Sequence, residues 1–169
     1  MADRDALAAD IAAIGRQEKA LALPAFDANV AWAIGSALRE RAATESLAIA
    51  IEIRRIDQQL FFAAMPGATP NNVAWVARKA AVVMRFHKSS YAMGLGLKRD
   101  GHSLAGRYGL ADADYAANGG AFPLVVTGAG LVGCATVSGL RQREDHELVV
   151  DVLAAHLSID RATLTLPHA

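Results

Sequence analysis

Residues 47–64 of the 169-residue chain read LAIAIEIRRIDQQLFFAA, and the predicted sheet begins here. Over 47–53, apolar side chains alternate with small or polar ones, which places Ile49, Ile51 and Ile53 on one face of a β-strand. A second β-rich run follows at 59–64, after the charged segment around Asp57. The two runs predict a β-hairpin with one buried face.

Helical patterns and a further hairpin surround this segment. Asp27 is suited to cap a helix, and Thr69 followed by Pro70 is a typical helix start with proline in the first turn. The segment 102–120 is rich in glycine, Asp and Asn, which predicts short helical turns within a long connecting loop. The helices are expected over 5–19, 28–44, 71–91 and 143–157, and the second hairpin over 122–126 and 131–137.

The order of these elements predicts the architecture. The hairpins follow one another without crossover helices, so the strands should form an antiparallel sheet with the helices packed on its faces. We therefore expect an α+β fold in one domain over 1–169, because this length is typical of a single domain.

Composition excludes several functional classes. The 17 basic and 17 acidic side chains balance, so there is no excess charge to bind nucleic acid or a membrane surface. The longest apolar runs are too short to span a membrane. Cys134 is the single cysteine, and residues 1–10 lack an apolar export core, so we expect a cytoplasmic protein.

Histidine and charge interrupt the apolar pattern at the end of the 71–91 helix. His87 and Tyr91 continue the core-facing stripe of that helix, with Arg85 and Lys88 beside them. A half-buried imidazole is mostly neutral at pH 7 and can donate, accept or ligate a metal, so His87 is a candidate ligand-binding residue. The alternative is a structural histidine bonded to a nearby backbone carbonyl.

The first turn of the last helix shows the same conflict. Asp145 and His146 fall within its apolar arc, and Arg143 precedes them. Helix N-termini stabilise carboxylates and bound anions, so these three residues could form one wall of a ligand site. In the alternative interpretation Asp145 caps the helix and His146 is a boundary residue with satisfied hydrogen bonds.

The 71–91 helix is apolar on a second side, through Trp75, Val82 and Phe86. Such a helix must be covered on both sides, and the second cover is often another subunit, which predicts a homo-oligomer. The alternative is that the connecting loop over 102–120 covers this face. A separate GAGLVG run at 128–133 matches the dinucleotide-binding pattern, but the β-branched residues after it favour a strand over the helix that this pattern requires.

Several separated motifs resemble the haem-degrading-domain family, which is related to GlcG, HbpS and the C-terminal domain of PduO. The motifs are DQQLFF at 57–62, VVMRFHKSSY at 82–91, DYA at 114–116 with the glycine pair at 119–120, and TVSGL at 136–140 before QREDH at 142–146. The resemblance implies a profilin-like fold with an antiparallel sheet of about four to five strands. It also implies dimers or larger rings, and binding of haem or a related tetrapyrrole with slow degradation in some relatives.

Three functional hypotheses follow, and whether the protein is an enzyme stays open. In the first, the protein binds haem, His87 ligates the iron with His146 as the alternative, and cationic side chains pair with the propionates. Those cations are Arg85, Lys88 and Arg143. In the second, the chain is an oligomeric scaffold; in the third, it is an enzyme that holds a small anionic metabolite near Arg143 and uses His146 as acid or base.

Overall fold

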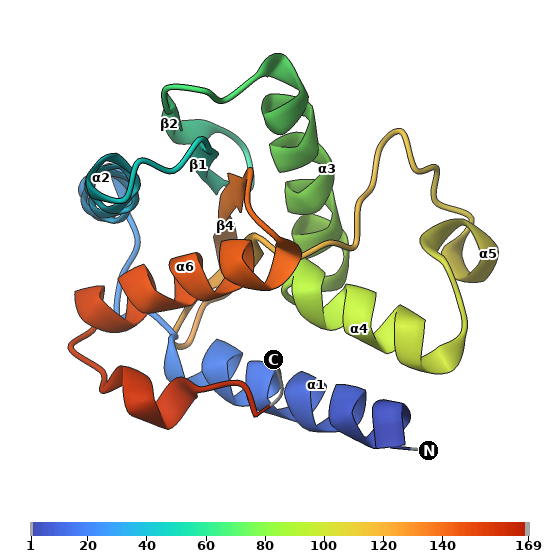
Figure 1. Ribbon diagram of the computed structural model, residues 1–169. Coiled ribbons are helices and arrows are strands. Elements are labelled where there is room, and N and C mark those ends of the chain that lie inside the picture. The colour runs from blue at the N-terminus through green and yellow to red at the C-terminus, as the bar shows by residue number, and fades with distance from the viewer. Residues whose placement is uncertain (1, 168–169) are drawn as a thin grey trace.

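The computed structural model describes residues 2–167 and places a four-stranded antiparallel sheet between helices (Figure 1). The strand order is β2-β1-β4-β3, so each predicted hairpin forms and the two join through β1 and β4. The strands are β1 (Ala50–Arg55), β2 (Gln59–Ala64), β3 (Ala121–Val126) and β4 (Gly130–Ser138). The expected α+β class is confirmed.

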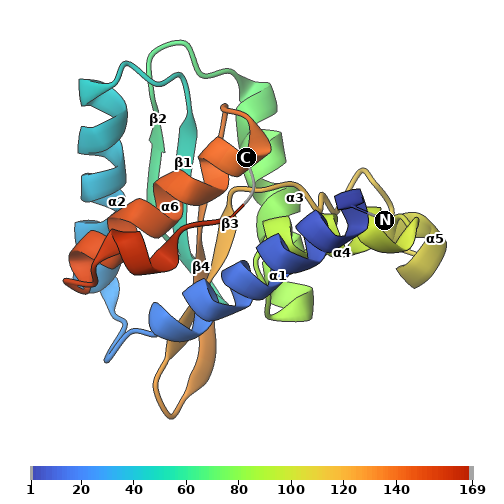
Figure 2. The ribbon, with the colours of Figure 1, turned by 60° about the horizontal axis from the view of Figure 1, so that its bottom comes forward.

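Helices cover both faces of the sheet. In Figure 2, α6 crosses in front of the strands and α2 stands beside β2; both pack on one face of the sheet, and α3 packs on the other. The helices are α1 (Ala2–Ala20), α2 (Ala28–Thr44), α3 (Pro70–Phe86), α4 (Ser90–Asp100), α5 (Leu104–Tyr108) and α6 (Gln142–His156), followed by a 3-10 turn at Arg161–Leu164. No helix within 2–167 combines the length and apolarity needed to span a membrane.

Side-chain alternation assigns the two faces of the sheet. Ile51 and Ile53 are fully buried toward α2 and α6, as their spacing predicts, whereas Cys134 faces α3. At Gly35 the backbone of α2 approaches the sheet closely, because a Cβ there would lie 2.3 Å from the ring of Phe61. The largest hydrophobic core therefore lies between α2, α6 and the sheet.

The helix predicted over 71–91 is interrupted, which corrects one expectation. α3 ends at Phe86, and His87 adopts a left-handed conformation (φ 55°) in which its N–H donates to the carbonyl of Val83. Ser89 then caps α4, its hydroxyl accepting from the N–H of Ala92. The expectation that His87 continues the core stripe is wrong, because the change of direction leaves its side chain exposed.

The second apolar face of α3 is covered by the chain itself. Val82 and Phe86 pack against Leu104 and Leu110, and the ring centroids of Phe86 and Tyr108 lie 4.9 Å apart. The segment 102–120 therefore covers Val82 and Phe86, so these two residues do not require a second subunit. Self-association stays a prediction that needs other support.

The glycine-rich run at 128–133 forms the turn between β3 and β4. Gly128 and Gly130 have φ of 82° and 83°, conformations that favour glycine, and the chain continues directly into β4. Because no helix begins here, the arrangement that a dinucleotide pyrophosphate requires does not form.

Candidate functional site

A buried ion pair joins α3 to α6 beside β4. The ammonium of Lys79 donates to Asp145 Oδ2 at 2.8 Å and to the carbonyl of Val137 at 3.2 Å. The two charged side chains are 4% and 1% exposed. Burial lowers the pKa of Lys79 and raises that of Asp145, while the attraction between the two charges acts in the opposite direction on each. The pair thus links two helices and a strand within the core.

Asp145 also receives backbone hydrogen bonds where β4 leads into α6. Its carboxylate accepts from the N–H groups of Gly139 at 3.4 Å and Leu140 at 3.1 Å. Asp145 thus accepts backbone N–H groups, as the capping interpretation expects, but they belong to residues before the helix, whose N-cap is Arg141, and Lys79 is an additional partner.

The glycine pair before β3 packs directly on this ion pair. At Gly120, where φ is 129°, a Cβ would lie 2.3 Å from the carbonyl oxygen of Val137 and 2.8 Å from Lys79 Nζ. At Gly119 a Cβ would lie 1.9 Å from the carbonyl oxygen of Gln142. Only residues without a side chain fit both positions, so this segment closes over the lysine.

The sequence pattern missed Lys79 as a site residue. In the sequence Lys79 follows Arg78, and this charged pair is typical of an exposed helix surface. The structure buries it with Val76, Ala80 and Val83, its neighbours at −3, +1 and +4 on the same face. That spacing was the available signal, because a lysine on a buried stripe requires a charged partner.

His146 is fully buried beside aromatic rings. Its ring centroid lies 5.2 Å from that of Tyr91 and 5.8 Å from that of Phe122. Its Nε2 lies 2.8 Å from Gln17 Oε1, and the amide nitrogen of Gln17 donates to the carbonyl of Leu164. This arrangement assigns the imidazole proton to Nε2 and leaves Nδ1 without a hydrogen-bond partner among the described residues.

The burial of His146 makes its imidazole neutral. Removal from water lowers its pKa to about 3, and the positive charges of Arg161 and Arg143 act in the same direction. None of its surface reaches solvent, so a ligand could contact it only if the surrounding helices separated. The geometry therefore supports a structural role more than ligation.

The other predicted site residues divide between two places. Arg143 is held in the core region by Asp10 at 3.3 Å and by the carbonyl of Leu166 at 3.2 Å. Tyr91, predicted to lie with His87, instead lies beside Asp145 and His146, because its ring contacts that of His146. The remaining three are exposed around the end of α3: Arg85, His87 and Lys88.

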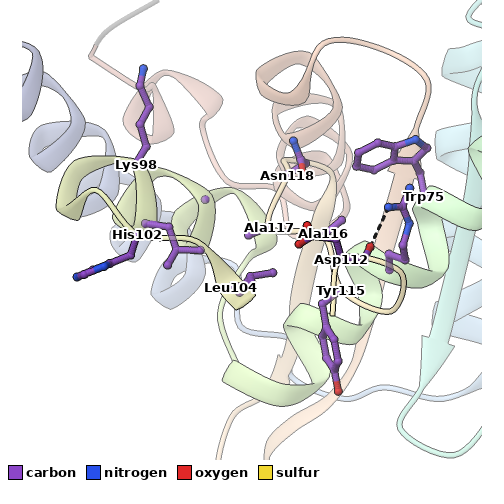
Figure 3. A pocket seen from close by; sticks show the side chains of 12 residues that line it. Trp75, Lys98, His102, Leu104, Asp112, Tyr115, Ala116, Ala117 and Asn118 are labelled. Atoms are coloured by element: carbon purple, nitrogen blue, oxygen red, sulfur yellow. Dashed lines mark hydrogen bonds between the residues drawn. The ribbon is translucent and has the colours of Figure 1, made fainter. Parts of the chain in front are cut away.

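Two neighbouring cavities share Trp75 and Asn118 in their walls. The first, here called the Trp75 cavity, has a volume of about 340 Å³ and lies between α3, α4 and the 112–118 segment (Figure 3). Lys98 and His102 point away from the main chain of 116–117 in this view. The second, here called the Lys79 cavity, measures about 250 Å³ and is lined by both residues of the ion pair.

A third hollow, here called the Arg99 groove, has a volume of about 200 Å³ and lies beside α4. Asp100 accepts two hydrogen bonds from Arg99 and one from Arg107, and these contacts lower the pKa of its carboxyl group, Arg99 having the largest effect. The lining residues are Ile11, Lys88, Ala92, Met93, Gly96, Leu97, Arg99, Asp100, Arg107 and Tyr108. The groove thus combines an apolar floor with three cations and one carboxylate.

Comparison with solved structures supports the fold. The protein called Ybr137w superposes with a TM-score of 0.80 at 27% identity, over 88% of each chain. A structure of a PduOC:heme complex superposes with a TM-score of 0.64 at 18% identity, over 79% of this chain and 94% of that chain.

Sequence comparison shows the family. A UPF0303 protein of Burkholderia mallei (strain ATCC 23344) is 54% identical over 160 residues, which cover 95% of this chain and 97% of the relative. The family model described as haem degrading protein HbpS-like matches residues 26–154. The chain therefore belongs to the HbpS-like family of haem-degrading proteins.

Proposed function

We propose that this protein binds haem or a related tetrapyrrole at the Arg99 groove. The observation that carries the proposal is the charge of the lining: Lys88, Arg99 and Arg107 stand against Asp100 alone. The excess of two positive charges matches the two propionates of haem, and charge-assisted hydrogen bonds from arginine to carboxylate are strong. The family description and the solved PduOC:heme complex are consistent with this ligand.

The residues of the groove suit a porphyrin. Met93 and Leu97 offer apolar surface to the ring, and Met93 and Tyr108 belong to the residue types that ligate haem iron in proteins. His87 immediately precedes Lys88 and its side chain is exposed, so it remains our proposed iron ligand. Bound haem would supply the redox chemistry of its iron, while the protein would hold the propionates and cover one face of the ring.

The geometry changes which cations we assign to the propionates. Arg143, expected from sequence, is already held by Asp10 and the carbonyl of Leu166. Arg99 and Arg107 line the groove instead, and a guanidinium has five N–H donors, so each retains donors beyond its bonds to Asp100. As part of this proposal we place the protein in the cytoplasm, because Cys134 is an unpaired, buried thiol.

Haem titration followed at the Soret band tests the proposal. We expect wild type to bind saturably, and Arg99→Ala/Arg107→Ala to weaken binding by about tenfold or more, because two charge-assisted contacts are lost. His87→Ala should shift the position of the Soret maximum, which reports the iron ligand. Arg39→Ala on α2 and His102→Ala at the Trp75 cavity are the matched controls.

Two results would overturn the groove as the site. One is equal affinity for wild type and the double arginine variant. The other is a loss of affinity in the His102→Ala control as large as in the groove variants, which would move the ligand to the Trp75 cavity.

A further inference from the structure

We propose that the Lys79 cavity is a second ligand site, which takes a small, neutral, planar molecule with adjacent N–H and C=O groups. The cavity measures about 250 Å³ and lies between the first three turns of α3, the junction of β4 with α6, and Asn118. It shares no lining residue with the Arg99 groove, so it is independent of the proposed haem site.

The charge of the lining favours a neutral ligand. Its charged residues are Lys79 and Asp145, which neutralise each other at 2.8 Å. A charged ligand would have to separate this pair or remain uncompensated beside it, and an unpaired charge is costly where side chains are this deeply buried. A neutral molecule avoids that cost.

The remaining polar groups complement an amide. Asn71, Asn118 and Gln142 line the cavity, and each carboxamide offers both a donor and an acceptor. The Lys79 ammonium has three hydrogens, and its hydrogen bonds within the described residues go to Asp145 and Val137. Both are internal contacts of a buried side chain, so the carboxamides carry the recognition: a ligand C=O can accept from a carboxamide N–H, and a ligand N–H can donate to a carboxamide oxygen.

An aromatic wall favours a planar ligand. The half-buried indole of Trp75 lines both neighbouring cavities. The guanidinium of Arg78 lies 4.1 Å from the centre of this ring, lines the Trp75 cavity and donates to the carbonyl of Asp112. Because Arg78 covers one face of this ring, a flat molecule in the Lys79 cavity would have to stack on the other face.

Tryptophan fluorescence tests the site without knowledge of the natural ligand. The chain has two tryptophans, so Trp32→Phe leaves Trp75 as the only indole. We expect uracil, a planar ring with adjacent N–H and C=O groups, to quench this signal saturably at millimolar or lower concentration. Glycerol and acetate probe a polyol and an anion, and neither should quench.

Variants in the Trp32→Phe background locate the binding. Gln142→Leu and Asn71→Ala change exposed residues that line the cavity, and each should weaken uracil binding about three- to tenfold, the effect of one hydrogen bond. Asn29→Leu, exposed on α2, is the matched control and should leave the affinity unchanged.

The outcomes separate this site from the haem proposal. Absence of saturable quenching by uracil, equal quenching by acetate or glycerol, or unchanged affinity in both cavity variants would overturn the second site. Gln142→Leu should leave the Soret titration as in wild type, so failure of haem binding and failure of uracil binding are distinguishable. Thermal melts of each variant verify that the fold is retained.

Discussion

His146 makes the stability of this protein sensitive to acid. Its pKa falls from about 6.5 in the unfolded chain to about 3 in the core, where burial excludes the charged form. Its contribution is complete above pH 6.5 and is lost progressively as pH falls toward 3, because only the unfolded chain takes up the proton in that range. At pH 5 this one group should reduce the unfolding free energy by about 2 kcal/mol relative to pH 7.

Replacement of His146 tests this sensitivity. His146→Gln keeps an amide donor for Gln17 but cannot titrate, so the difference in unfolding free energy between pH 7 and pH 5 should shrink by about 2 kcal/mol. Urea unfolding at the two pH values measures it. His102→Gln, at an exposed position, should leave the difference unchanged. If His146→Gln retains the full difference, other groups cause the acid sensitivity.

Removing Lys79 alone should lower the unfolding free energy more than replacing both Lys79 and Asp145 by apolar residues. Lys79→Met leaves the carboxylate of Asp145 buried without its cation, which typically costs about 3–5 kcal/mol. In Lys79→Met/Asp145→Leu both charges are absent, so stability should recover in part, although Gly139 and Leu140 lose an acceptor for their N–H groups. Denaturant unfolding of both variants measures the difference. A double variant less stable than Lys79→Met would contradict this account.

At the scale of elements, the end of α3 is set by one left-handed residue. His87 has φ 55° at the helix C-cap, a position where glycine is favoured. His87→Gly should therefore raise the unfolding free energy by about 0.5–1 kcal/mol, provided that the imidazole makes no stabilising contact. Chemical denaturation measures the gain. His102→Gly provides the comparison for loss of an exposed imidazole, and a destabilised His87→Gly would show that the side chain contributes to the fold.

Gly120, just before β3, cannot be replaced easily for two reasons: its backbone conformation and the lack of space for a Cβ. Two variants separate these reasons. Gly120→Ala combines an unfavourable φ of 129° with a Cβ that would meet Val137 and Lys79, whereas Gly128→Ala has an unfavourable φ of 82° in open space. Gly120→Ala should therefore be clearly the more destabilising, by several kcal/mol against about 1–2 kcal/mol. Equal melting temperatures for the two variants would mean that the 119–120 segment moves away easily.

The starts of elements were predictable from sequence, and some ends were not. Asp27 and the Thr69–Pro70 pair act through neighbouring residues, so local patterns placed the starts of α2 and α3 correctly. The end of α3 depends on a left-handed His87 and a cap from Ser89, which interrupt a periodicity that continues past them. Periodicity alone therefore predicted one helix where two form.

At the scale of the whole molecule, the site depends on pairings between distant residues. The polar residues Asp145 and His146 were visible as exceptions on an apolar arc, and both are buried. Their partners were not visible, because Lys79 lies 66 positions from Asp145 and Gln17 lies 129 positions from His146. Sequence periodicity identifies a buried polar group, whereas its partner depends on how helices pack across the sheet.

Self-association remains a prediction, and exposed aromatic side chains on α2 and β2 now support it. Trp32 is 66% exposed on α2 and contacts Phe61 of β2, an edge strand on which Phe62 is also exposed. Native mass spectrometry should give a multiple of the 17.7 kDa chain mass. Trp32→Glu should shift the assembly toward monomer, because a carboxylate cannot be buried there unpaired, whereas Val73→Glu on α3 should not. A wild-type monomer at micromolar concentration would contradict the prediction, and an unchanged Trp32→Glu assembly would place the interface elsewhere.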